Sequence, residues 1–153
     1  MNLLQKKGTL SPTLVFQDKI AVVNDKNISV LRELAQNHKM KRSRICLHGD
    51  DRDKVHEMLI FMCKDSVIPP HRQPVSKKTY LIIKGSMKVV FYDENGNETR
   101  TEVLSPSDNF ILSFNPQFFH HPVLMDEDVF FLETLEGPYP ENKAKFAPWI
   151  NDN

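Results

Sequence analysis

The chain has 153 residues, of which 40% are hydrophobic and 26% are charged, values typical of one globular domain. Lysine plus arginine and aspartate plus glutamate number 20 each, so the protein has no net charge to attract a polyanion. This balance counts against nucleic acid and membrane surfaces as partners and favours a small ligand.

Cysteine content and the N-terminus bear on the expected location. Cys46 and Cys63 do not form a disulfide framework or a zinc knuckle, and we expect two reduced thiols, with Cys63 buried. The first ten residues lack the apolar stretch of a signal peptide. The longest apolar run, Met58 to Cys63, is far below the roughly 20 residues that span a bilayer. We therefore expect a cytoplasmic protein.

The N-terminal part is predicted to contain an arm, a strand and a helix. Residues 1–13 lack hydrophobic periodicity and predict a loose arm, while residues 14–23 predict a peripheral strand. Asn27 can cap the helix that follows, and His38 and Lys39 would close its last turn. Four apolar residues recur on one face of this helix at the 3.6-residue period: Ile28, Leu31, Leu34 and Ala35.

The rest of the chain is predicted to consist of short strands. The best segments are 55–63, 79–85, 86–93, 98–104, 109–114 and 129–137. Asn95 and Gly96 separate two of these segments and indicate a hairpin, because both residue types tolerate positive φ. Many closely spaced strands after a single helix favour an antiparallel sandwich or barrel. The proline-rich and aromatic tail predicts an ordered strap over it.

One histidine and one glutamine stand out in the segment from Pro69 to Gly85. His71 and Gln73 are two residues apart, so on a strand they point to the same face. A jelly-roll barrel that encloses a metal takes two ligands from such a pair, one from the next strand and a last histidine from a later hairpin.

The spacing of this segment resembles the first motif of the cupin superfamily. His71 stands at the first ligand position, Gln73 at the second histidine, Lys78 at the glutamate and Gly85 at the closing glycine. Asp65 stands where the motif opens with a glycine.

The stretch NPQFFHH resembles the second cupin motif. Asn115, Gln117 and His120 fall at its marked positions, so the resemblance implies that His120 is the last ligand. Adjacent strand residues face opposite ways, so at most one of His120 and His121 points inward. The family register selects His120, and a register counted from Pro116 selects His121.

Longer similarities cover roughly residues 20–150 and resemble the WbuC-type cupin-fold metalloproteins, which are associated with surface-polysaccharide gene clusters. They include RSRICLH, the PPHR turn, FYDENG, and a closing GPY followed by FAPW. The resemblance implies an all-β cupin double-stranded β-helix, that is, a jelly-roll barrel, at residues 44–140. An arm, strand and helix would precede it (1–43), a C-terminal strap would follow it (141–153), and the chain would form a homodimer.

Two substitutions alter the ligand chemistry that the resemblance implies. Glutamine is a weaker donor than imidazole, and a protonated lysine cannot ligate. An ammonium in place of a carboxylate repels a divalent ion by about several kcal/mol even at an effective dielectric of 20. A Zn, Fe, Mn or Ni ion held by His71, Gln73 and His120 should therefore be bound weakly, or the site holds no metal.

Lys78 suggests a substitute for the missing metal charge. Glu133 lies in a segment with apolar residues on both faces, so its carboxylate is expected to be partly buried and in need of a partner. We expect Lys78 to pair with an acidic group such as Glu133, or with an acidic ligand.

Three other features have two readings each. His48 belongs to the family's Leu-His pair and lies either at the pocket mouth or in an exposed turn. Tyr80 is either a core residue or a pocket residue that stacks on a ligand. The basic segment 38–44 predicts a solvated helix end, with Arg44 able to reach back to the barrel; the alternative is a phosphate or nucleic-acid contact.

Two functional classes follow. The first is a small-molecule-binding cupin protein that acts on a sugar or surface-polysaccharide precursor, with weak or lost metal binding. The second is a metal-dependent sugar isomerase or epimerase that uses His71 and His120 for proton transfer. A bound ion or a histidine with a perturbed pKa would favour the second class.

Overall fold

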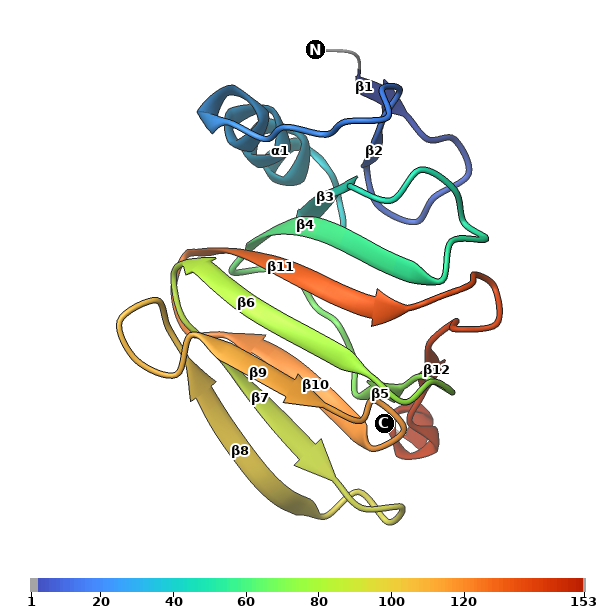
Figure 1. Ribbon diagram of the computed structural model, residues 1–153. Helices are drawn as coiled ribbons and strands as arrows, with labels where there is room; N and C mark the ends of the chain where they lie inside the picture. Colours follow the sequence, from blue (N-terminus) through green and yellow to red (C-terminus); the bar gives the residue numbers. More distant parts are fainter. Residues whose placement is uncertain (1–2, 153) are drawn as a thin grey trace.

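The structure is a computed structural model that describes residues 3–152, with side chains to residue 150. Within these residues the chain forms two β-sheets, one α-helix and a short 3-10 helix (Figure 1). The seven-stranded sheet has the order β1-β2-β3-β4-β11-β6-β9, and the five-stranded sheet has the order β12-β5-β10-β7-β8. All neighbouring strands are antiparallel except β2 and β3.

The elements have the following bounds: β1 Leu3–Gln5, β2 Thr13–Phe16, α1 Asp25–Asn37, β3 Arg42–Cys46, β4 Val55–Cys63, β5 His71–Arg72, β6 Lys78–Lys84, β7 Met87–Tyr92, β8 Glu98–Leu104, β9 Ile111–Phe114, β10 Phe119–Leu124, β11 Asp128–Glu136, β12 Lys145–Phe146 and η1 Pro148–Asp152.

Two hydrophobic clusters hold these elements together. The first lies between the facing sheets and includes Tyr80, Val89 and Phe131. The second packs α1 against the large sheet and includes Leu31, Ile45 and Phe61. Figure 1 shows α1 beside β3 and β4, at the end of the molecule farthest from β8. The large sheet therefore has a barrel-facing side and a helix-facing side.

Helix α1 begins earlier than the sequence pattern predicts. Asn24 is the N-cap, and Asn27, predicted to be the cap, is the third helical residue and accepts from the Asn24 backbone in a capping box. Each asparagine side chain satisfies a backbone amide that the first turn leaves free. Leu31 and Ala35 are fully buried, as the periodicity predicts, while Ile28 and Leu34 are half-buried.

The strong strand predictions agree with the structure. Segments 55–63 and 98–104 correspond to β4 and β8, and the predicted hairpin joins β7 to β8 with Gly96 at φ +85°. Strands β3, β5, β10 and β12 were not predicted as separate strands. Two predictions are wrong in the N-terminal region, because residues 3–5 pair with β2 and the strand predicted at 14–23 ends at Phe16.

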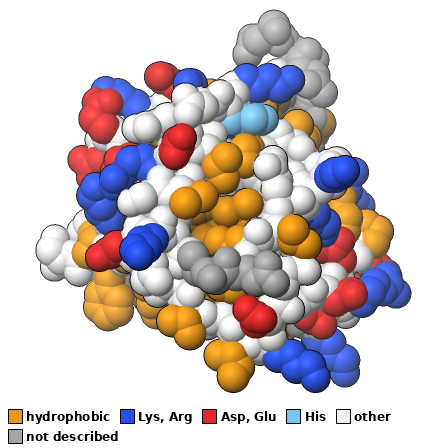
Figure 2. Space-filling view, turned by 90° about the horizontal axis from the view of Figure 1, so that it is seen from above, with side chains coloured by type: hydrophobic (Ala, Val, Ile, Leu, Met, Phe, Trp, Pro, Cys, Tyr) orange, Lys and Arg blue, Asp and Glu red, His pale blue; other side chains and the backbone are white. Residues whose placement is uncertain are grey.

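Two smaller features complete the fold. Cys63 is half-buried rather than buried, because it is the last residue of β4. The C-terminal segment pairs β12 with β5, and Trp149 packs on Phe119 with ring centroids 4.7 Å apart. The face seen from above in Figure 2 has hydrophobic side chains near its centre and charged side chains around them. None of the helices in residues 3–152 has the length and apolar composition to cross a membrane.

The glycine at the end of the first motif has a steric role. Gly85 turns the chain between β6 and β7 at φ +77°, and an added Cβ would lie 2.3 Å from the Asp128 carbonyl oxygen. Gly8 has a similar φ of +74° but nothing within 4 Å of its position for a Cβ. Only the first of these two positions combines positive φ with a close backbone approach.

We predict that Gly85→Ala lowers the free energy of unfolding by about 2–5 kcal/mol, through left-handed strain and displacement of the Asp128 backbone. Gly8→Ala is the matched control, which carries the strain alone and costs about 1–2 kcal/mol. Urea denaturation of both variants measures the difference. Equal losses would contradict a role for the close approach.

Candidate functional site

Strands β6 and β11 bring three of the predicted residues to the barrel-facing side of the large sheet. Lys78 and Tyr80 alternate with exposed or half-buried residues along β6, and they are 2% and 1% exposed. Tyr80 lies opposite Glu133 on β11, and Lys78 lies opposite Leu135, so Glu133 is the diagonal neighbour of Lys78 on the same face. A lysine head and a carboxylate are therefore enclosed together.

The small sheet supplies the two histidines. His71 on β5 lies directly opposite His120 on β10, and their ring centroids are 4.4 Å apart. His120 has no exposed surface, whereas His121 is half-buried on the other face of β10. The register that places His120 inward is therefore the one the chain adopts.

The Lys78 ammonium is the centre of this group. Its Nζ donates to Gln73 Oε1 at 2.8 Å, lies 3.2 Å from His120 Nε2, and is 3.5 Å from Glu133 Oε2. The Tyr80 ring centroid is 5.2 Å from the same nitrogen. An ammonium has three donors, and three acceptors surround it here. The pairing expected between Lys78 and Glu133 is present in the structure.

Backbone carbonyls fix the tautomers of both histidines. His71 Nδ1 lies 2.9 Å from the Pro69 carbonyl oxygen, and His120 Nδ1 lies 2.9 Å from that of Phe118. A carbonyl oxygen only accepts, so Nδ1 carries the hydrogen in each ring and Nε2 is the acceptor. The lone pair of His120 therefore points at Lys78.

Gln73 is held at both ends of its amide. Its Oε1 accepts from Lys78, and its Nε2 donates to the Asn142 carbonyl oxygen at 3.2 Å. The two contacts together fix which end of the amide faces the lysine. The amide oxygen, the only atom of Gln73 that could ligate a metal, is already engaged.

Burial and the neighbouring ammonium keep both histidines neutral. Burial first, and then the charge of Lys78, lower the pKa of His71 to about 3 and that of His120 to about 2. Burial lowers the pKa of Lys78, and the Glu133 carboxylate opposes that shift. Neutral imidazoles accept from the ammonium, so these protonation states support one another.

These residues do not fit a divalent metal ion. A metal between His71, Gln73 and His120 would compete with the Lys78 nitrogen for the same acceptors, and the two cations would repel each other. In the described part of the chain, no cluster of three or more His, Cys, Asp or Glu could hold a metal ion. Stable metal binding would require Lys78 to leave the centre.

A cavity of about 160 Å³ lies beside this group. His71, Gln73, Lys78, Tyr80 and Glu133 line it, together with apolar residues such as Ile60 and Phe131. Its lining also includes Ser11 and Arg42, which the sequence interpretation did not place at the site, and Arg44, which it expected to be able to reach the barrel. Segment 38–44 was predicted to be a helix end, but residues 42–44 belong to β3, where alternation directs both arginines to the barrel side.

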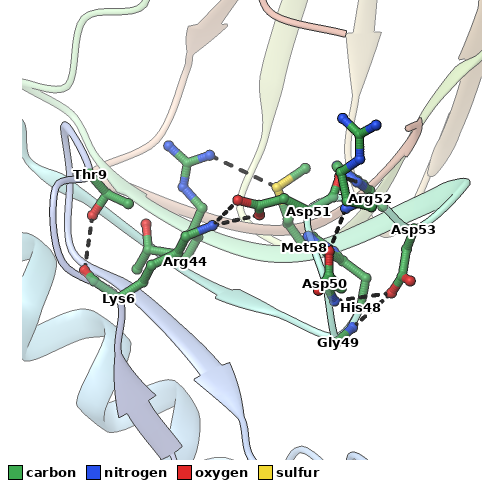
Figure 3. Close-up of polar contacts among 12 residues, drawn as sticks. Lys6, Thr9, Arg44, His48, Gly49, Asp50, Asp51, Arg52, Asp53 and Met58 are labelled. Carbon is green, nitrogen blue, oxygen red and sulfur yellow. Dashed lines mark hydrogen bonds and ion pairs between the residues drawn. The ribbon is translucent and has the colours of Figure 1, made fainter. Parts of the chain in front are cut away.

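His48 lies away from this cavity. It stacks on His56 with ring centroids 4.1 Å apart and lines a separate depression with Lys6 and Asp51. Figure 3 shows it in the loop that carries Gly49, Asp50 and Asp51. The structure therefore does not bring His48 together with His71 and His120.

A wider depression of about 460 Å³ lies on the other side of Gln73. Its charged lining is partly neutralised, because Arg72 pairs with Glu94 at 2.8 Å and also lies over the Phe119 ring. The smaller cavity contacts most of the enclosed polar group, whereas the wider depression contacts only Gln73 among these residues.

The two facing sheets form a jelly roll of the cupin fold, as do the solved structures with similar folds. The chain belongs to the family described as Domain of unknown function (DUF6016), which matches residues 23–104, more than half of its length. No curated protein matches the chain in sequence.

The similar solved structures include the DMSP lyase DddQ from Ruegeria pomeroyi DSS-3, with a TM-score of 0.54, 17% identity, and coverage of 69% of this chain and 51% of that one. They also include an oxalate oxidase, with a TM-score of 0.50, 12% identity, and coverage of 62% and 47%. The matched part spans about half the length of these proteins. At such low identity the similarity concerns the fold alone, and the predicted cupin jelly roll is confirmed.

The histidine pKa values predict an acid dependence of stability. A histidine whose pKa is lower in the folded state than in the unfolded state binds fewer protons when the protein is folded. The free energy of unfolding therefore falls as the pH drops below the histidine pKa of the unfolded state, about 6.5. The decrease should reach about 1.4 kcal/mol per pH unit for each histidine and continue toward pH 3 for His71 and pH 2 for His120.

Urea denaturation between pH 4 and 7 tests this dependence. A His71→Asn/His120→Asn variant should lose most of the slope below about pH 6, because it removes both groups. The control His38→Asn, at the end of α1, should keep it. Identical slopes in the double variant and the native chain would contradict the assignment.

The Lys78 and Glu133 pair predicts strong coupling. Lys78→Met and Glu133→Leu should each cost about 3–5 kcal/mol of unfolding free energy, because each leaves a buried charge without its partner. The double variant should cost clearly less than the sum of the two single variants. Lys84 and Asp128, an ion pair of 3.4 Å on the same two strands, give the exposed control. There the coupling should be about 1 kcal/mol or less. Additive losses at Lys78 and Glu133 would rule the pairing out.

Proposed function

We propose that the protein is a cupin-fold small-molecule-binding protein in which the Lys78 ammonium takes the place of a metal ion. The observation that carries this proposal is the position of Lys78 Nζ, within 3.5 Å of Gln73 Oε1, His120 Nε2 and Glu133 Oε2. A cation at the centre of these acceptors performs the structural task of a bound ion. It supplies positive charge and orients the polar side chains around the cavity.

Two features favour ligand binding over proton-transfer catalysis at this site. A general base works best with a pKa near the working pH, whereas the pKa values of His71 and His120 are about 3 and about 2. The acceptor nitrogen of His120 already faces Lys78. A metal-dependent isomerase or epimerase that uses these histidines would need Lys78 to withdraw first.

The WbuC-type sequence resemblance supports a sugar or a surface-polysaccharide precursor as the ligand. The cavity of about 160 Å³ is smaller than the roughly 300–1,000 Å³ of typical ligand pockets. A single small sugar, or one end of a larger precursor, matches this size.

Metal content tests the proposal directly. Elemental analysis of the native chain, purified and then incubated with Zn²⁺ or Mn²⁺, should find far less than one metal per chain. The variant Gln73→His/Lys78→Glu replaces the ammonium by a carboxylate and adds an imidazole, so it should bind about one metal per chain. The control Gln36→His/Lys77→Glu makes the same exchanges at exposed positions and should bind none stoichiometrically.

Stoichiometric metal in the native chain would overturn the proposal and favour the metal-dependent enzyme. Circular dichroism of each variant establishes that it folds. If the double variant does not fold, the native measurement still decides, because it needs no substitution.

A further inference from the structure

Two arginines at the cavity have no acidic partner. Arg42 and Arg44 are two residues apart on β3 and share its barrel-facing side, while Ser43 and Ile45 face α1. Both arginines are half-buried and line the cavity next to Glu133 and Lys78. Strand β3 therefore contributes two half-buried arginine side chains to the lining of this cavity.

The contacts of these arginines are weak or neutral. Arg42 Nη1 donates to the Val67 carbonyl oxygen at 2.9 Å, and Arg44 Nη2 donates to Ser11 Oγ at 3.3 Å. Arg44 Nη1 lies 3.9 Å from Met58 Sδ, and Figure 3 shows this contact together with the ion pair between Lys6 and Asp51. Within the part of the chain described, neither guanidinium forms an ion pair with an acidic side chain.

The charges of the cavity do not balance. Its charged lining consists of Arg42, Arg44, Lys78 and Glu133, and the last two neutralise each other. Two positive charges remain in a partly desolvated site, where unpaired charge is costly. Burial and then the charge of Arg44 lower the pKa of Arg42, which reflects the proximity of the two cations.

A donor suited to a polar ligand lies in the same lining. Burial raises the pKa of Tyr80 well above its ordinary value, so its hydroxyl stays protonated and can donate. Lys78 is not available for this purpose, because Gln73, His120 and Glu133 surround its nitrogen. The expectation that Lys78 contacts an acidic ligand is therefore better met by the arginines of β3.

We propose that the cavity binds the carboxylate or phosphate group of a small ligand between Arg42 and Arg44. This inference rests on the proposed function, since it gives the ligand class of the same site. Guanidinium groups bind both oxyanions through paired, charge-assisted hydrogen bonds. The volume of about 160 Å³ suits one small oxyanion-bearing group better than a nucleic-acid backbone.

Calorimetric titration of the full chain tests this site with four probes: inorganic phosphate, glucose 1-phosphate, glucuronate and glucose. An anionic probe should bind, and glucose should bind much more weakly. Preference for glucose 1-phosphate identifies phosphate as the group, and preference for glucuronate identifies carboxylate. Affinity for the preferred probe should fall with added salt, because the interaction is between charges.

Substitutions locate the site. Arg42→Met and Arg44→Met each remove one guanidinium, and each should weaken binding of the anionic probe by about tenfold to a hundredfold. Arg44→Lys keeps the positive charge but not the paired donors of the guanidinium, so it should lose less affinity than Arg44→Met. The control Arg52→Met, at an exposed arginine paired with Glu141, should leave the affinity unchanged.

Three outcomes would overturn the anion site: no anionic probe binds, glucose binds as well as the anions, or the Arg42 and Arg44 variants bind like the Arg52 control. If one of the two methionine variants does not fold, the other methionine variant and Arg44→Lys still test the site. A metal-free native chain that binds no anion overturns this inference alone. Stoichiometric metal in the native chain overturns the proposed function instead.

Discussion

A buried ammonium joins the two sheets at the centre of this barrel. Lys78 extends from β6 of the large sheet to Gln73, which follows β5, and to His120 on β10 of the small sheet. It also lies beside Glu133 on β11. A buried charge is tolerated only when its donors are satisfied, so the surrounding side chains have little freedom to rearrange. The Gln73 orientation depends on this cation, and its charge adds to burial in lowering the histidine pKa values, while backbone carbonyls fix the histidine tautomers.

The same cation shapes what the cavity can bind. Because Lys78 and Glu133 neutralise each other, the net charge of the cavity comes from Arg42 and Arg44. These arginines reach it because β3 is shared between two layers, with Ser43 and Ile45 packed toward the helix. The proposed anion site therefore depends on the two arginines of β3 and not on the central ammonium.

The parts of the fold that the sequence predicted have strong local patterns. Strand β4 has a long apolar run, and β8 follows the Asn95-Gly96 turn and ends just before Ser105 and Pro106, so local residue pattern locates both strands. Strands β1, β5 and β12 have only two or three residues, and their pairing depends on partners far along the chain. Asn27 resembled a cap because the capping box places an asparagine at both of its positions.

The residues of the candidate site were also predicted only in part. Strand periodicity paired His71 with Gln73, because residues two apart share a face. The cupin resemblance added Lys78 and His120, and Glu133 was expected as a partner of Lys78 because its segment is apolar on both faces. Arg42 was missed, and Arg44 was expected only to be able to reach the barrel, because basic residues next to a helix usually indicate solvent. Their inward direction depends on the tertiary position of β3. His48 was placed by motif alone, and its loop carries it to a different depression.

The most direct test of this account is a crystal structure of the native chain grown with Mn²⁺, with anomalous diffraction recorded to locate the metal. The account predicts the Lys78 nitrogen in hydrogen-bond contact with Gln73 and His120, and no anomalous peak between His71 and His120. An ordered manganese bound by these residues, with Lys78 turned away, would contradict it.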